Sequence, residues 1–256
     1  MAIRELFELS GKVVLVTGGS RGLGLQMAEA FGEMGARLAI SARKPSELDE
    51  AKEKLLGLGY DCLTVVNDLS KAEQVPALVD AVVAHYGTID VLVNNAGTSW
   101  GAPVEQHTLE AWNKVMTLNT TSVFLLSQAV ANRCFIPNKR GNIINIASVA
   151  ALRTSMQMPA AAYHASKAAT LHLTHALACE WGKYGVRVNA ICPGFFPSKL
   201  ASGLLEKIEA SVVARTPLGR IGGDGDLMGA AVFLASEASR HITGEHIVVD
   251  GGASIA

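Results

Sequence analysis

The sequence predicts an α/β fold in which a doubly wound parallel sheet of seven strands is flanked by helices. Short runs of β-branched and aliphatic residues alternate with longer helical stretches along the 256 residues of the chain. The short runs are continuously apolar rather than alternating, which indicates burial on both faces and is typical of a parallel sheet between two helix layers. No linker or change in composition divides the chain, so we expect residues 1–256 to form a single domain.

The first half of the chain supplies four of the seven predicted strands. Each is a short apolar run rich in Val, Ile and Leu, and the four runs lie at residues 12–17, 37–41, 62–66 and 90–93. Helices are predicted between them. The first follows a glycine-rich turn, the second spans 46–56 with Pro45 near its start, and the third spans 71–85.

The second half continues the same alternation. Residues 109–130 form one long helix or two abutting helices, and residues 163–181 form another. The remaining strands are predicted at 141–146, 186–191 and 246–250.

Composition and charge exclude several classes of function. Apolar residues make up 49% of the chain and charged residues 18%, so the chain can bury a substantial core. Lys and Arg number 22 against 23 Asp and Glu, and this net charge of -1 gives no electrostatic case for binding nucleic acid or an anionic membrane. No apolar run approaches the roughly 18–20 residues that span a bilayer, and the first eight positions carry charges where a secretory signal has its apolar centre.

Cysteine and histidine usage indicates neither a disulfide framework nor a metal site. The four cysteines are widely spaced and contain no C-x-x-C pair. His172, His175 and Cys179 share one face of a predicted helix, but no fourth ligand is apparent, so packing or a subunit contact is the better interpretation. We therefore expect a cytoplasmic enzyme without a bound metal.

A glycine-rich loop, residues 17–24 with the sequence T-G-G-S-R-G-L-G, joins the first predicted strand to the first helix. Glycines at such a junction let the backbone turn tightly and approach a pyrophosphate, whose charge is favoured by the free N–H groups of the helix amino terminus. A purely structural turn is the alternative. The position between a strand and a helix near the chain start favours a dinucleotide site.

The residues after the second strand indicate which dinucleotide is bound. NAD enzymes place a carboxylate there for the ribose 2′-hydroxyl, whereas NADP enzymes need a cation for the 2′-phosphate. Here Arg43 and Lys44 follow the strand, Arg21 of the glycine loop adds a third cation, and the strand end carries no carboxylate. Solvated surface charges are the alternative interpretation. We expect NADP(H) as cofactor, with NAD(H) less favoured.

Three further residues predict the chemistry. Tyr163 and Lys167 are four positions apart, so they share one face of the predicted helix. A phenol with a pKa of about 10 is a poor acid–base catalyst near neutrality, and a nearby ammonium lowers that pKa. Ser148 directly follows the fifth predicted strand, which places its hydroxyl at the sheet edge where ligands bind in open α/β folds.

Together these residues resemble the classical short-chain dehydrogenases/reductases over essentially the full length of the chain. Within that family the chain is similar to 3-oxoacyl-[acyl-carrier-protein] reductases and gluconate 5-dehydrogenases. The resemblance implies a Rossmann-like fold with dinucleotide-binding and catalytic functions in one domain. The matching elements, in the family's order, are residues 17–24, 67–69, 94–97, Asn119, Ser148, Tyr163 with Lys167, 193–194 and 249–252.

The resemblance implies roles for four catalytic residues, Asn119, Ser148, Tyr163 and Lys167. Tyr163 would exchange a proton with the substrate oxygen while the nicotinamide exchanges a hydride with the carbon. Ser148 would hydrogen-bond that oxygen and stabilise its developing charge. Lys167 would bind the nicotinamide ribose and lower the tyrosine pKa, and Asn119 would hold a water that completes a proton relay.

The same resemblance implies the cofactor contacts. Asp68 and Leu69 would contact the adenine, residues 95–97 would form the wall beside the ribose, and Ser198 would replace a threonine near the carboxamide while retaining its hydroxyl. The full expected set is Gly18, Ser20, Arg21, Gly22, Leu23, Gly24, Arg43, Asp68, Leu69, Asn95, Ala96, Gly97, Tyr163, Lys167, Pro193, Gly194, Phe196 and Ser198.

Two segments are expected to determine the substrate. Residues 195–222 are rich in apolar side chains and predict a mobile helical lid, which would exclude water and orient the substrate. The spacing from Ser148 to Tyr163 is slightly longer than in the 3-oxoacyl reductases, so the loop that carries Arg153, Met156 and Met158 would reach the substrate pocket. Arg153 could contact an anionic substrate, although an exposed loop arginine is the commoner case.

Three functions remain open from the sequence. The first is an NADP(H)-dependent oxidoreductase that interconverts a ketone and a secondary alcohol, with an apolar ketone or a 3-oxoacyl thioester as the substrate. The second is a polyol or sugar-acid dehydrogenase of the gluconate type. The third is a dinucleotide-binding regulator without catalysis, which the intact catalytic set argues against. The only partners expected are the small-molecule substrate and further copies of the chain. Because the family commonly forms tetramers and residues 168–173 add apolar surface to the catalytic helix, we expect a homotetramer.

Overall fold

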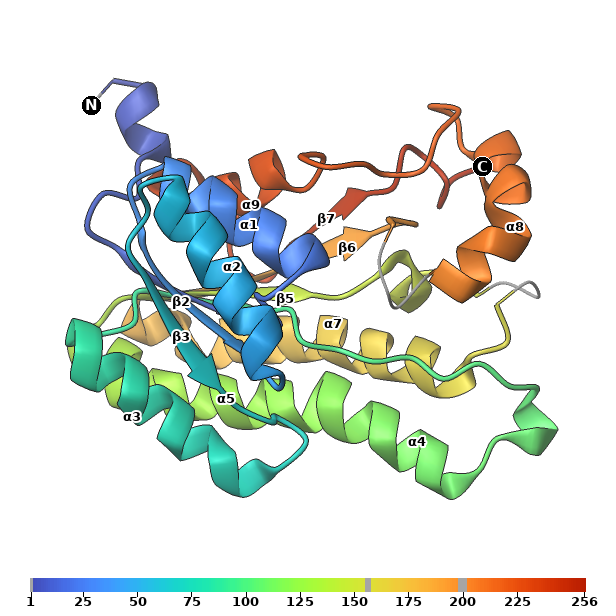
Figure 1. The fold of residues 1–256 in the computed structure, drawn as a ribbon, viewed down its shortest axis with the longest axis horizontal. Coiled ribbons are helices and arrows are strands. Elements are labelled where there is room, and N and C mark those ends of the chain that lie inside the picture. The colour runs from blue at the N-terminus through green and yellow to red at the C-terminus, as the bar shows by residue number, and fades with distance from the viewer. Residues whose placement is uncertain (1, 155–157, 198–201) are drawn as a thin grey trace.

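The computed structural model describes residues 2–154, 158–197 and 202–256. Across these ranges, seven parallel strands form one sheet in the order β3-β2-β1-β4-β5-β6-β7, which confirms the predicted doubly wound, Rossmann-like fold (Figure 1). The strands are β1 Val13–Thr17, β2 Arg37–Ala42, β3 Cys62–Val66, β4 Val91–Asn94, β5 Gly141–Ile146, β6 Val186–Pro193 and β7 His246–Val249.

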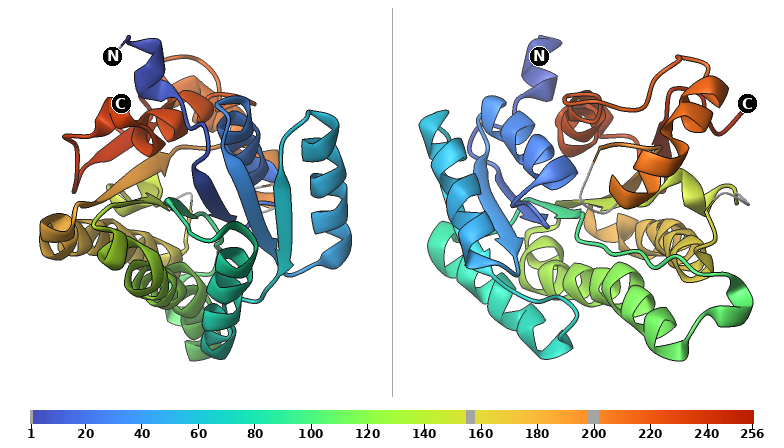
Figure 2. Two further views of the ribbon diagram at one scale, coloured as in Figure 1. Left: turned by 90° about the vertical axis from the view of Figure 1, so that its left-hand side faces the viewer. Right: turned by 45° about the vertical axis from the view of Figure 1, so that its right-hand side comes forward.

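Helices cover both faces of the sheet (Figures 1 and 2). One face carries α1 Gly22–Glu33, α2 Pro45–Gly57 and α9 Met228–Ala235. The other face carries α3 Val75–Tyr86, α5 Ser122–Val130 and α7 Ala161–Trp181. Three further helices are α4 Leu109–Met116, the short α6 Ile136–Asn138, and α8 Ser202–Arg215 near the C-terminus. In the described part of the chain, no helix has both the length and the apolarity needed to cross a membrane.

The central strands are apolar throughout because alternate side chains enter different layers. In β1, Val14 and Val16 pack in the core that contains Phe31 of α1. Val13 and Leu15 point the other way and pack in the core that contains Phe135. These four residues of β1 have no exposed surface.

The structure refines the predicted helices at three places. The helix predicted at 71–85 is a 3₁₀ turn, Ala72–Gln74, followed by α3, since Pro76 lacks an N–H and fits only the first turn of an α-helix. The stretch predicted at 109–130 is α4 and α5 separated by a π-helical turn, Thr117–Thr121. Helix α9 was not predicted, because its sequence, MGAAVFLA, is apolar on every side and shows no helical periodicity.

The strand order reverses at β1, which has β2 on one side and β4 on the other. The helices that follow β1 and β4 therefore depart toward opposite faces, and a crevice opens at the carboxyl ends of these two strands. The sequence motifs follow the strands at this edge.

Candidate active site

A cavity of about 540 Å³ lies at the carboxyl ends of the strands, a size usual for small-molecule sites. Asp68 and Asn119 are not among its described lining residues, and Ser198 lies outside the described residues. The predicted site residues that do line it are Gly18, Ser20, Arg21, Gly22, Leu23, Gly24, Arg43, Leu69, Asn95, Ala96, Gly97, Ser148, Tyr163, Lys167, Pro193, Gly194 and Phe196.

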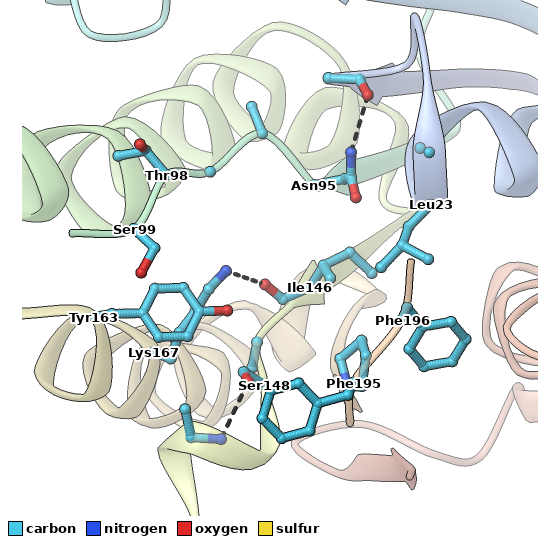
Figure 3. Close-up of a pocket in the computed structure, with 18 of the residues that line it drawn as sticks. Leu23, Asn95, Thr98, Ser99, Ile146, Ser148, Tyr163, Lys167, Phe195 and Phe196 are labelled. Atoms are coloured by element: carbon cyan, nitrogen blue, oxygen red, sulfur yellow. Dashed lines mark hydrogen bonds between the residues drawn. The ribbon is translucent and has the colours of Figure 1, made fainter. Parts of the chain in front are cut away.

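Tyr163, Lys167 and Ser148 lie together in this cavity (Figure 3). Helix α7 carries Tyr163 and Lys167 one turn apart, and Ser148 follows β5. The Lys167 ammonium donates to the Ile146 carbonyl at 2.7 Å and lies 5.7 Å from the centre of the Tyr163 ring. The Ser148 hydroxyl accepts from the Ala150 amide at 3.1 Å, which fixes its oxygen beside the phenol.

Burial shifts the pKa values of Tyr163 and Lys167 in opposite directions. Desolvation raises the pKa of Tyr163 above its ordinary value of 10.0, and the hydrogen bond with Ser148 only partly opposes this. Desolvation also lowers the pKa of Lys167 to about 8. The loss of water around the phenol therefore dominates its pKa, and the Lys167 ammonium is directed at the Ile146 carbonyl. That Lys167 lowers the tyrosine pKa stays a prediction.

Asn119 lies behind the cavity, in the π-helical turn between α4 and α5, and is almost fully buried. Its side-chain oxygen accepts from the Thr98 amide at 2.8 Å, and its side-chain nitrogen donates to the Thr98 carbonyl at 2.8 Å and to the Ser166 hydroxyl at 2.9 Å. Both donors of the amide are thus used. Asn119 joins the segment after β4 to the catalytic helix α7.

The glycine loop packs closely against the end of β4. The Asn95 side chain donates to the carbonyls of Thr17 at 2.8 Å and Gly18 at 3.1 Å, and the Thr17 hydroxyl accepts from the Asn95 amide at 3.0 Å. A methyl group at Gly24 would overlap the Gly18 carbonyl oxygen and the Asn95 side chain. Sequence reasoning gave Asn95 a place beside the ribose but missed this role in holding the loop.

At the end of β2, the structure adds a carboxylate that the sequence analysis missed. Glu47, in the first turn of α2, lines the cavity together with Arg21, Arg43 and Lys44. Its carboxylate accepts from Arg21 at 2.5 Å and from Lys44 at 3.3 Å. Arg43 forms no ion pair with any residue in the described ranges, so its guanidinium can receive a phosphate. The cations and the close glycine loop fit a bound dinucleotide with a phosphorylated ribose.

The two expected adenine contacts are placed differently. Leu69 is buried and lines the cavity. The Asp68 carboxylate instead accepts from the backbone amide of Ser70 at 3.1 Å and from its hydroxyl at 2.7 Å. Partial burial opposes ionisation of Asp68, but these hydrogen bonds, with the nearby charge of Arg43, keep its pKa below the ordinary value.

At the substrate end, Arg153, Phe195 and Met158 line the cavity beyond Ser148. Phe195 lines the same cavity as Ser148, whereas Phe196 is also part of a buried core cluster (Figure 3). The Arg153 guanidinium donates to the main-chain carbonyl of Ala253 and lies 3.4 Å from that of the C-terminal Ala256.

Helix α8 closes one side of this cavity. Ile208, Val212 and Arg215 line it, and Val212 is buried. Leu200, an apolar residue of the lid expected at 195–222, lies outside the described residues.

Comparisons with known proteins find similarity over essentially the whole chain. Residues 18–254 match the family model described as enoyl-(acyl carrier protein) reductase. The chain is 38% identical over 259 residues to a gluconate 5-dehydrogenase of Gluconobacter oxydans, with both chains covered completely. It is 40% identical over 253 residues to a 2-dehydro-3-deoxy-D-gluconate 5-dehydrogenase of Escherichia coli, covering 98% of each chain.

A solved structure is similar over the whole chain as well. The crystal structure of a gluconate 5-dehydrogenase from Burkholderia cenocepacia, in complex with NADP and tartrate, superposes with a TM-score of 0.95 at 35% sequence identity, and 100% of each chain is covered. At this identity the likeness extends beyond the fold to the protein family.

Proposed function

The chain belongs to the short-chain dehydrogenase/reductase family and is an oxidoreductase, and from this premise we propose that it interconverts a ketone and a secondary alcohol with NADP(H). One observation carries the proposal. Ser148, Tyr163 and Lys167 lie in the same cavity as the glycine loop, so a substrate carbonyl and a dinucleotide can share it. When bound, NADP(H) supplies the hydride-transfer chemistry.

The residues of the chain supply proton transfer and orientation. Tyr163 gives a proton to the substrate oxygen during reduction and accepts it during oxidation. Ser148 donates a hydrogen bond to the same oxygen and stabilises its negative charge. Lys167 binds the ribose hydroxyls next to the reacting centre. Because both amide donors of Asn119 are used, we assign it a positioning role for α7, and holding a relay water stays the role that the family resemblance implies for it.

Phosphate recognition supports NADP(H) over NAD(H). Three cations surround the end of β2, and Arg43 is free of ion pairs to the described residues. The related Burkholderia cenocepacia enzyme was solved with NADP. The proposed cofactor contacts are the cavity-lining residues given above, together with Asp68 and Ser198 from the family pattern.

A sugar-acid substrate is the second candidate, and Arg153 favours it. This guanidinium lines the cavity at the substrate end. Its hydrogen-bond partners within the described residues are main-chain oxygens of Ala253 and Ala256. A substrate carboxylate would be a stronger, charge-assisted partner. The relatives named above act on gluconate or a deoxy derivative by their names.

The substrate class can be tested directly with purified protein. Simple ketones, 3-oxoacyl thioesters and sugar acids would each be assayed with NADP(H) and NAD(H), following the absorbance of the reduced nicotinamide. We expect turnover with NADP(H) and at least one carbonyl class. Cofactor binding without turnover of any carbonyl or alcohol would favour the non-catalytic regulator instead.

Tyr163→Phe is the matched test of catalysis. Removing the phenol oxygen should lower kcat by about 10²–10⁴-fold, since proton transfer contributes a factor of that order. NADPH binding, measured by fluorescence titration, should be nearly unchanged. A Tyr163→Phe enzyme with near-normal turnover would show that the phenol does not transfer the proton.

Arg153→Gln tests the sugar-acid candidate. Loss of a charged hydrogen bond should raise KM for a sugar acid by about tenfold or more while leaving KM for a neutral ketone unchanged. Arg133→Gln is the control, because Arg133 is exposed and pairs only at 3.8 Å with Asp80. Equal effects of Arg153→Gln on charged and neutral substrates would argue against a carboxylate contact.

We further propose that the protein is a cytoplasmic homotetramer and that residues 1–256 form a single domain. Helix α8, within residues 195–222, would act as a substrate lid. Residues 168–173 of α7, which were expected at a subunit contact, support the tetramer only in part. Leu171 is buried within the chain, and Leu173 packs against the core of the chain. Better support comes from Trp112 on α4 and Phe124 on α5, whose side chains are 37% and 40% exposed.

A further inference from the structure

Glu47 lies near the expected position of the ribose 2′ group, which is a phosphate in NADP and a hydroxyl in NAD. It lies in the first turn of α2, where the helix dipole favours a carboxylate, and it lines the cavity beside Arg43 and Lys44. Building on the proposed function, we propose that Glu47 sets the cofactor selectivity of this enzyme by reducing its preference for a ribose 2′-phosphate over a 2′-hydroxyl.

Arg21, Arg43 and Lys44 form a cation cluster at this end of the cavity. The contacts of Glu47 place its carboxylate inside the cluster rather than at its margin. Its side chain is only 17% exposed, whereas those of Arg21 and Lys44 are 45% and 66% exposed. The two cations therefore reach over the carboxylate from the glycine loop and from the turn before α2. The ion pair with Arg21 joins the loop expected to hold the pyrophosphate to the helix expected to flank the ribose.

This carboxylate opposes a 2′-phosphate in two ways. A phosphate monoester carries close to two negative charges at neutral pH, and a like charge within the same cluster repels it. Arg21 and Lys44 also already donate to Glu47, so a phosphate must share these donors or displace the carboxylate from them. Arg43, without an ion pair among the described residues, is the cation that binds phosphate without this competition.

The same carboxylate favours a 2′-hydroxyl. A ribose hydroxyl is a hydrogen-bond donor, and NAD sites bind it with an Asp or Glu after the second strand. Here the end of β2 carries Ser41 and Ala42, and the carboxylate comes from the following helix instead. Glu47 thus makes the site usable by both dinucleotides, with the cations favouring NADP(H) and the carboxylate favouring NAD(H).

The test compares Glu47→Gln with the wild-type protein and uses ligands that lack the nicotinamide. Adenosine 2′,5′-bisphosphate and adenosine 5′-monophosphate differ only at the 2′ position, and calorimetric titration gives their dissociation constants without turnover. Glu47→Gln should bind the bisphosphate about two- to tenfold more tightly and the monophosphate more weakly, so the selectivity ratio should rise several-fold. Glu50→Gln, which removes an exposed charge from the same helix, should leave the ratio unchanged.

A second variant guards against a simple folding defect. Glu47→Asp keeps the charge but withdraws it by one methylene, and it should raise the ratio in the same direction by a smaller factor. If the wild type binds the bisphosphate and the Glu47→Gln ratio equals that of Glu50→Gln, the role of Glu47 is wrong while the proposed function stands. If the wild type binds neither nucleotide, the proposed dinucleotide site itself is wrong, and the inference falls with it.

Discussion

Burial of the Tyr163–Lys167 pair opposes the charged form of each partner, and this bears on the direction of catalysis. The raised pKa of Tyr163 keeps the proton on the phenol throughout the neutral range. A protonated phenol beside Ser148 is ready to donate to a substrate oxygen, as carbonyl reduction requires. Alcohol oxidation needs the phenolate, which this environment disfavours until further positive charge is bound in the cavity.

The pKa of Lys167, lowered by burial to about 8, predicts a pH limit for reduction. Lys167 is charged below this pKa and loses its charge as the pH rises through it, while the phenol keeps its proton. We expect kcat/KM for ketone reduction to be constant below about pH 7 and to fall tenfold per pH unit above about pH 8, because kcat/KM reports the groups of the free enzyme. The pH profile of initial rates measures this.

Lys167→Arg is the control for this assignment. A guanidinium stays protonated at every pH used, so whatever activity remains should not decline near pH 8. A wild-type profile that stays constant to about pH 10 would contradict the assignment of this ionisation to Lys167.

Which site residues could be predicted depends on the range of the interaction. Tyr163 and Lys167 were found because helical spacing brings them together and Ser148 and the other motifs accompany them. Glu47 was missed because its effect depends on contacts across 26 positions, between the glycine loop and α2. The hydrogen bonds of Asn119 to Thr98 and Ser166 also join residues that are far apart in sequence, so the local sequence does not predict them.

At the scale of elements, the strand bounds were predictable to within two residues because burial of the strands leaves a continuous apolar signal. Helix α9 was not, since its sequence is apolar or glycine at every position and lacks the polar stripe that reveals helical periodicity. The π-helical turn that separates α4 from α5 carries the buried Asn119 and leaves no signal in the composition. Such turns concentrate at functional sites.

The junction between β1 and α1 gives a prediction for an element as a whole. Gly24→Ala would push the helix away from the Gly18 carbonyl and Asn95, so it should lower the free energy of unfolding by about 1–3 kcal/mol and weaken NADPH binding. Denaturant unfolding and fluorescence titration measure the two effects. Gly57→Ala is the matched control at the end of α2, where an added methyl group meets nothing within 4 Å. Equal stability of the two variants would mean that the close approach at Gly24 is unimportant.

At the scale of the whole molecule, one edge of the sheet collects motifs that are far apart in sequence. The glycine loop, Asn95, Ser148 and Pro193 each lie at the carboxyl end of a different strand, and parallel connections return every carboxyl end to the same edge. That convergence follows from the fold class alone. The contact of Arg153 with the C-terminal residues does not, because it depends on where a tail of the chain comes to lie.

Assembly is the remaining property of the whole molecule, and the surface of α4 and α5 predicts where copies meet. Trp112 and Phe124 expose large apolar rings on neighbouring helices that lie on the same side of the sheet as α7 (Figure 1). Phe124→Glu would place a charge in such a contact and should convert the proposed tetramer into smaller species, as measured by light scattering at micromolar concentration. Leu56→Glu, on the exposed side of α2, is the control and should leave the mass unchanged. A wild-type monomer would refute the tetramer, and a Phe124→Glu tetramer would mean that the copies meet through another surface, since burying an unpaired carboxylate at a subunit contact costs several kcal/mol.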